Sequence, residues 1–138
     1  MNTMAPIRPA QQQARRVRLA AGPAAPAEAR NQLRAAIRAW DVCADPDVAV
    51  LLTSELVTNA IRHGTGETVT LAITCSPGEL RVDVHDASST LPLLAEAPGD
   101  AETGRGLLLV ASLSADWGCY HTPAGKAVYF TLACQSRP

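Results

Sequence analysis

The sequence has few aromatic residues, one lysine and no excess of charge of either sign. Five of its 138 residues are aromatic, so aliphatic side chains must build the core. Twelve basic residues against thirteen acidic ones leave a formal charge of −1, which argues against a nucleic-acid binder. Lys126 is the one lysine, and the many arginines and alanines point to a G+C-rich bacterial genome.

Long apolar runs are also missing. No segment approaches the ~18 apolar residues of a membrane span. The apolar stretch at residues 19–27 is broken by one glycine and two prolines, which excludes an ordinary signal peptide. We therefore expect a cytoplasmic protein without a membrane partner.

Four cysteines occur without a C-x-x-C pair and without histidine at ligand spacing, which argues against a zinc site. Their neighbours are apolar, as is typical of small buried thiols. We expect structural thiols in a reducing compartment. The four residues are Cys43, Cys75, Cys119 and Cys134.

The composition, 47% hydrophobic and 18% charged, excludes wholesale disorder, and the length fits one domain. Residues 1–12 are expected to form a flexible tail, and residues 13–138 a single domain. The patterns predict an edge strand (15–20), two helices (28–40 and 46–63), a hairpin (68–75 and 80–86), a helix (104–114) and a second hairpin (116–121 and 126–134). This order predicts an α+β fold: a two-layer sandwich of a mostly antiparallel sheet with helices on one face.

Local signals mark the ends of the second helix and a long loop. Asp45-Pro46 is an acidic N-cap followed by proline at the first helical position, and Gly64 is the expected C-cap. Residues 87–103 lack periodicity, and a loop of this length is usually a lid or a binding loop.

One helix face carries a carboxylate and a carboxamide. Glu55 and Asn59 lie one turn apart, whereas Val50, Val57 and Ile61 point the opposite way as an apolar stripe. Two interpretations stay open for the polar pair. It is either a solvated helix face or a site for a hard cation or proton transfer, since both residues offer oxygen atoms.

The first predicted hairpin ends on an acidic residue. Strand alternation in V-D-V-H-D, residues 82–86, puts Val82, Val84 and Asp86 on one face. Asp86 therefore either caps a turn or accepts a hydrogen bond from an amino group of a ligand.

Two glycines open the third predicted helix. Free N–H groups and the positive end of a helix bind phosphate in many proteins, although an ordinary tight turn explains Gly104 and Gly106 equally well. Arg105, between them, either reaches an anionic oxygen or lies on the surface.

These three segments resemble a known superfamily. E-L-V-T-N-A-I-R-H-G (55–64), V-x-V-x-D (82–86) and T-G-R-G-L-L-L-V (103–110) are similar to the motifs of the gyrase, heat-shock chaperone, histidine kinase and mismatch-repair ATPases, which share the Bergerat, or histidine-kinase-like ATPase, fold. Within it, the chain most resembles the stand-alone anti-sigma-factor serine kinases and their actinobacterial relatives, over about residues 17–133.

The resemblance implies that the chain binds ATP and Mg²⁺. Asn59 would coordinate the Mg²⁺ that bridges the phosphates, and Glu55 would be the general base that takes the proton of a seryl hydroxyl. Asp86 would bind the adenine amino group. His63 would pack or hydrogen-bond near the site.

The third motif would hold the phosphates. By the same resemblance, Gly104 and Gly106 would let the backbone approach them and Arg105 would add charge, with residues 87–103 as the ATP lid. The chain also departs from the pattern. The family usually has D-x-G-x-G where this sequence reads D-A-S-S-T, and Ala127 falls where a threonine that helps to hold adenine is common. The missing glycines predict a less permissive backbone and a different position of the lid, and Ala127 predicts weaker adenine binding.

The implied function is that of an ATP-dependent protein serine kinase and anti-sigma-type regulator. Its substrate would be a serine on an anti-anti-sigma antagonist in a partner-switching system, and the kinase would be a homodimer; whether a sigma factor is bound as well stays open. An alternative is a nucleotide-gated protein-binding module with little phosphoryl transfer. A third, the catalytic domain of a histidine kinase, is disfavoured because no dimerisation helix with a phosphoacceptor histidine precedes the motifs.

Overall fold

The computed structural model describes residues 12–88 and 101–134, and in the second range side chains from residue 106 onward. The predicted tail, except for its last residue, and residues 89–100 of the predicted lid lie outside the described residues. In chain order the elements are β1 (Gln13–Ala20), α1 (Ala25–Trp40), α2 (Pro46–His63), β2 (Thr68–Ser76), β3 (Glu79–Asp86), α3 (Ala101–Leu113), β4 (Asp116–Thr122) and β5 (Gly125–Ala133).

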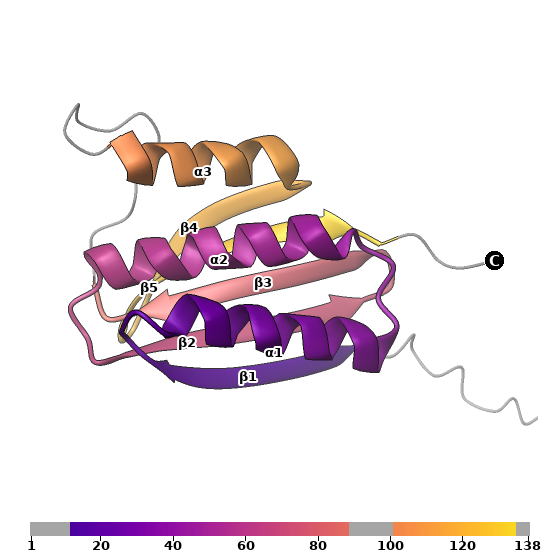
Figure 1. Ribbon diagram of the computed structural model, residues 1–138, viewed down its shortest axis with the longest axis horizontal. Helices are drawn as coiled ribbons and strands as arrows, with labels where there is room; N and C mark the ends of the chain where they lie inside the picture. The colour runs from indigo at the N-terminus through magenta and orange to yellow at the C-terminus, as the bar shows by residue number, and fades with distance from the viewer. Residues whose placement is uncertain (1–11, 89–100, 135–138) are drawn as a thin grey trace, which may run out of the picture.

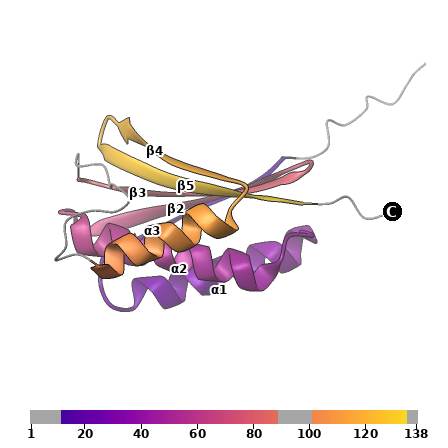
Figure 2. The ribbon, with the colours of Figure 1, turned by 90° about the horizontal axis from the view of Figure 1, so that it is seen from above.

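The strands form one antiparallel sheet in the order β1-β2-β3-β5-β4. All three helices lie on the same face of this sheet, with α2 between α1 and α3 (Figures 1 and 2). The predicted two-layer α+β sandwich is therefore confirmed, as is the edge position of the first strand. The other face, which no described helix covers, is called the open face below.

The core between the sheet and the helices is aliphatic, as the composition requires. Leu52 and Val57 of α2 are completely buried, and so are Leu71 of β2 and Val82 of β3. Phe130 is the one aromatic residue in the buried core of the described residues. Burial of such side chains gives roughly 1.5–3 kcal/mol each, so the apolar faces fix how the layers pack.

Two helices begin earlier than the sequence predicts. α1 begins at Ala25 rather than at residue 28, because Pro26 falls in the first turn, where a missing N–H costs nothing. α3 begins at Ala101 rather than at Gly104, so residues 101–103 belong to a helix and not to the predicted loop. The predicted start of α3 was therefore wrong, and both glycines lie inside the helix.

The ends of α2 follow the local signals. The side chain of Asp45 accepts hydrogen bonds from the N–H groups of Asp47 at 2.9 Å and Val48 at 3.3 Å, as expected of an N-cap. Gly64 is the C-cap, but its φ of −81° is one that any residue adopts. Glycine is needed there because a Cβ would collide with the carbonyl oxygen of Ala60.

Both predicted hairpins are present. β2 and β3 pair from Ser76 and Glu79 onward, across a turn in which Gly78 has φ of +83°. That conformation favours glycine, which explains the P-G sequence of the turn. β4 and β5 pair in the same way from Thr122 and Gly125 onward.

All four cysteines are free thiols and partly buried. Burial raises the pKa of Cys134 to about 11 and also raises the pKa of Cys75 and of Cys119, as expected of packed rather than reactive thiols. Among the described helices, none has the length and apolarity needed to cross a bilayer.

Candidate functional site

Helix α2 carries Glu55 and Asn59 on the side that faces α3. Asn59 is 6% exposed and Glu55 is half-buried. A solvated face is therefore the wrong interpretation for Asn59, because α3 packs against α2 beside Glu55 and removes this face from water. His63 is exposed at the last position of the same helix, one turn beyond Asn59.

Helix α3 comes close to Glu55 at Gly106. A Cβ at this position would lie 2.7 Å from Oε2 of Glu55, closer than real Cβ atoms come to other atoms. Gly106 is thus explained by the contact between two helices. It lies within α3, as does Gly104, so neither glycine forms a loop before the helix; the side chain of Arg105 lies outside the described residues.

Asp86 ends β3 with its carboxylate already engaged. Lys126 Nζ donates to Oδ1 at 2.9 Å and to Oδ2 at 2.7 Å, and the backbone N–H of Ser88 donates to Oδ1 at 2.8 Å. The two charged side chains are 1–2% exposed. The carboxylate predicted to receive an adenine amino group is therefore held in a buried ion pair.

The Ser88 bond also accounts for the missing glycines of the second motif. A side-chain oxygen that accepts from the N–H two residues on is an Asx turn, one of the two interpretations that the sequence left open for Asp86. Here a side chain fixes the backbone after β3 where the family pattern has glycines.

Lys126, and not Ala127, is the neighbour of Asp86. The register of β3 and β5 pairs Asp86 with Lys126 and His85 with Ala127, so Ala127 points to the open face. Ala127 therefore lies on the opposite face of the sheet from the carboxylate of Asp86. A signal for Lys126 existed: alternation puts it on the same side of β5 as Val128 and Phe130, which makes it a lysine in an apolar stripe.

Two glycines bring other elements into contact with Asp86. A Cβ at Gly125 would collide with the carbonyl oxygen of Asp86 and with the backbone of Ala87. A Cβ at Gly64 would lie 3.4 Å from the Cβ of Asp86. The end of β3 thus meets the C-terminal end of α2, where Asn59 and His63 also lie.

Comparisons with known proteins identify the family of the chain. The sequence profile of the histidine kinase-like ATPase domain family matches residues 8–132, nearly the whole chain. The chain belongs to this family. The resemblance seen in the sequence motifs is thereby confirmed, and membership in the ATPase family implies that the chain binds ATP.

A solved structure shares the fold of this histidine kinase-like ATPase domain. It is the crystal structure of the RsbU and RsbW domains of Rv1364c from Mycobacterium tuberculosis, with a TM-score of 0.66 and 23% sequence identity. The match covers 91% of this chain and 33% of that chain, so this domain spans about a third of its length. No curated protein gives a significant match.

The chemistry of Asn59 on α2 fits a magnesium ion whose other ligands would be phosphate oxygens. Oδ1 of Asn59 is buried and has no hydrogen-bond partner among the described residues, which is costly unless a ligand or ion supplies one. A carboxamide oxygen suits a hard cation. The described residues hold no group of three His, Cys, Asp or Glu side chains able to bind a metal.

Proposed function

We propose that this ATPase domain is an ATP-dependent protein serine kinase of the anti-sigma type, which phosphorylates a seryl hydroxyl on an antagonist protein. The observation that carries the proposal is the position of Glu55 one turn from Asn59, whose buried Oδ1 has no hydrogen-bond partner in the described part of the chain. An ATPase that only binds a partner needs no carboxylate beside its metal-binding residue. The fold shared with a chain named for its RsbW domain supports the same assignment.

Each residue then has a chemical role. Asn59 would hold Mg²⁺ through Oδ1, and that ion would neutralise charge on the phosphate oxygens. Glu55 takes the proton of the seryl hydroxyl as its oxygen bonds to the γ-phosphorus and ADP leaves. A positioned general base typically contributes ~10²–10⁴-fold in rate. Gly104, Gly106 and Arg105 would lie at the phosphate end of the site.

Asp86 would receive the adenine amino group at the acceptor site that Lys126 and Ser88 leave open. A carboxylate has about four acceptor sites, and Lys126 and Ser88 already use three of them. We therefore expect ATP to bind, and more weakly than it would to an unpaired carboxylate.

A Glu55→Gln variant tests the proposal. The amide keeps the size of the side chain but cannot accept a proton, so phosphoryl transfer should fall by at least about a hundredfold while calorimetric binding of Mg·ATP is retained. Transfer is measured with γ-labelled ATP and the small antagonist domains of the source organism. Asp47→Asn, an exposed carboxylate in the first turn of the same helix, is the matched control. Equal transfer by wild type and Glu55→Gln would overturn the general-base role.

A second candidate is a nucleotide-gated binding module, which the buried Asp86–Lys126 pair favours because it occupies the adenine carboxylate. In that case wild type would bind its partner in an ATP-dependent manner and transfer no label.

The kinase is proposed to act as a homodimer, with an anti-anti-sigma protein and a sigma factor as partners. Light scattering at tens of micromolar tests the dimer, and a monomer would contradict it.

A further inference from the structure

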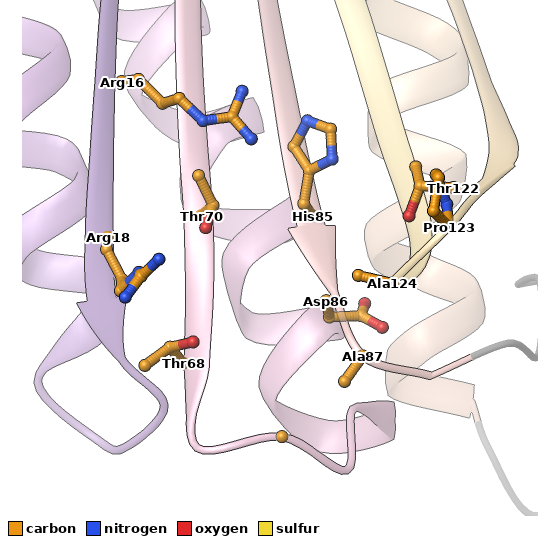
Figure 3. A pocket seen from close by; sticks show the side chains of 11 residues that line it. Arg16, Arg18, Thr68, Thr70, His85, Asp86, Ala87, Thr122, Pro123 and Ala124 are labelled. Carbon is orange, nitrogen blue, oxygen red and sulfur yellow. The ribbon is translucent and has the colours of Figure 1, made fainter.

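The open face of the sheet is hollowed at the end where β1 and β3 finish. A cavity of about 520 Å³ lies there, within the range of small-molecule sites. It is lined by side chains from four strands and by the turn between β4 and β5 (Figure 3). The helices pack on the other side of the sheet, so this cavity is separate from the Glu55–Asn59 face.

The charge in this cavity is positive. Arg16 and Arg18 alternate on β1, so both point to the open face, where they are exposed. Neither guanidinium forms a hydrogen bond or an ion pair with another described residue. Asp86 is the one carboxylate among the lining residues, and Lys126 neutralises it from the core side. Among the described residues that line the cavity, these two arginine charges therefore have no unpaired counter-charge.

Neutral hydrogen-bonding groups surround these charges. Thr70 lies between Arg18 and His85 in the sheet register, and Thr68 and Thr122 also line the cavity. Hydroxyls beside arginines complement the oxygens of a phosphate group, because guanidinium binds two oxygens at once.

The environment of the cavity also shifts the pKa of His85. Burial and the nearby Arg16 lower the pKa of His85, and Asp83 and Asp86 on its own strand oppose this only in part. From β4, Tyr120 contacts the imidazole edge-on, with the ring centres 6.4 Å apart. His85 is therefore neutral near pH 7, and an anion placed beside Arg16 would favour its protonation.

We propose that the open-face cavity binds a small phosphorylated molecule through Arg16 and Arg18, with His85 and the threonine hydroxyls as further hydrogen-bonding partners. The cavity volume matches a compact metabolite. The chain's balanced charge and the short extent of the basic cluster disfavour a nucleic acid, which would need a longer basic track. The proposal does not rest on the proposed kinase function, although Asp86 lies at the border of both sites.

Amide NMR shifts during titration with inorganic pyrophosphate test the proposal at constant ionic strength. We expect saturable shifts at Arg18, Thr70 and His85. Arg16→Ala/Arg18→Ala should weaken binding by at least about tenfold, since each arginine contributes charge-assisted bonds. The matched control is Arg34→Ala/Arg38→Ala, which removes two exposed arginines from α1 and should leave binding unchanged. Shifts confined to the amides around Glu55 and Asn59 would report pyrophosphate in the nucleotide site and overturn the open-face site.

The pH dependence of binding and a phosphopeptide competitor test the roles of His85 and of ligand size. Pyrophosphate itself gains a proton between about pH 8 and about pH 6, so the pH dependence is measured as the ratio of the affinities of wild type and His85→Gln. This ratio should rise as the pH is lowered, because the bound anion favours protonated His85. A phosphoserine peptide is titrated in parallel. Much tighter binding of the peptide than of pyrophosphate or ribose 5-phosphate would overturn the small-molecule assignment in favour of a phosphoprotein. Equal binding by wild type and the Arg16/Arg18 variant would overturn the site itself.

Discussion

Removing one member of the buried Asp86–Lys126 pair leaves its partner as an uncompensated charge in the core. Lys126→Met keeps a flexible side chain of similar length, so the change is mainly electrostatic. Asp86→Asn leaves the ammonium group buried beside a neutral amide. The double variant Asp86→Asn/Lys126→Met removes both charges together.

The magnitude follows from the burial. With both side chains 1–2% exposed, water cannot solvate the remaining charge, and breaking such a pair costs about 3–5 kcal/mol. The free energy of unfolding of a domain is about 5–15 kcal/mol, so each single variant should lose a large share of its stability. The double variant should be more stable than either single one, since replacing a buried ion pair by neutral groups is often nearly neutral.

Urea unfolding of wild type, both single variants and the double variant near neutral pH measures this coupling as a thermodynamic cycle. We expect a coupling free energy of at least about 2 kcal/mol. Arg34→Met, which removes an exposed charge from α1, should change stability by less than about 0.5 kcal/mol. Single variants that each lose less than about 1 kcal/mol and add without coupling would refute the reasoning. The same result matters for tests of function. Loss of nucleotide binding by Asp86→Asn alone would not distinguish the loss of a contact with the nucleotide from unfolding of the domain.

Three other variants or groups give separate tests. Gly106→Ala should raise helix propensity by up to about 1 kcal/mol while crowding the carboxylate of Glu55, so the melting temperature should hold and phosphoryl transfer should fall; intact transfer would contradict the close approach of α3. Gly125→Ala should destabilise the protein by more than about 2 kcal/mol in urea, because its Cβ meets rigid backbone at Asp86, and wild-type stability would exclude that contact. Because burial raises the pKa of Cys134 to about 11, roughly one-thousandth of this thiol should be thiolate near pH 8. Its alkylation should therefore be slow near pH 8 and accelerate about tenfold per pH unit. Alkylation of Cys134 near pH 8 at the rate of an exposed thiol would show that it is not buried.

Local patterns predicted most of the elements. Asp45-Pro46 marked the start of α2 because the cap and the proline act within one turn, and alternation in residues 82–86 placed Val82, Val84 and Asp86 on the buried side. The start of α1 was missed because two prolines and a glycine within residues 22–26 indicate a break, whereas a proline in the first turn of a helix is tolerated.

The site itself depends on contacts between distant parts of the chain. Asp86 and Lys126 are 40 residues apart, and only the pairing of β3 with β5 brings them together. Burial of Asn59 likewise depends on where α3 packs, which the pattern of α2 does not contain. The family resemblance supplied candidate residues, but it could not show that one of them already has a partner within the chain.

The burial of Lys126 has a practical consequence. Because it is the one lysine of the sequence, its ε-amine is the single primary amine of the chain besides the α-amino group. An acylating reagent should tag Lys126 only when the pair with Asp86 opens. The mass of the tag on Lys126, followed over time with and without ATP, would therefore report how often the end of β3 opens, without any substitution in the sequence.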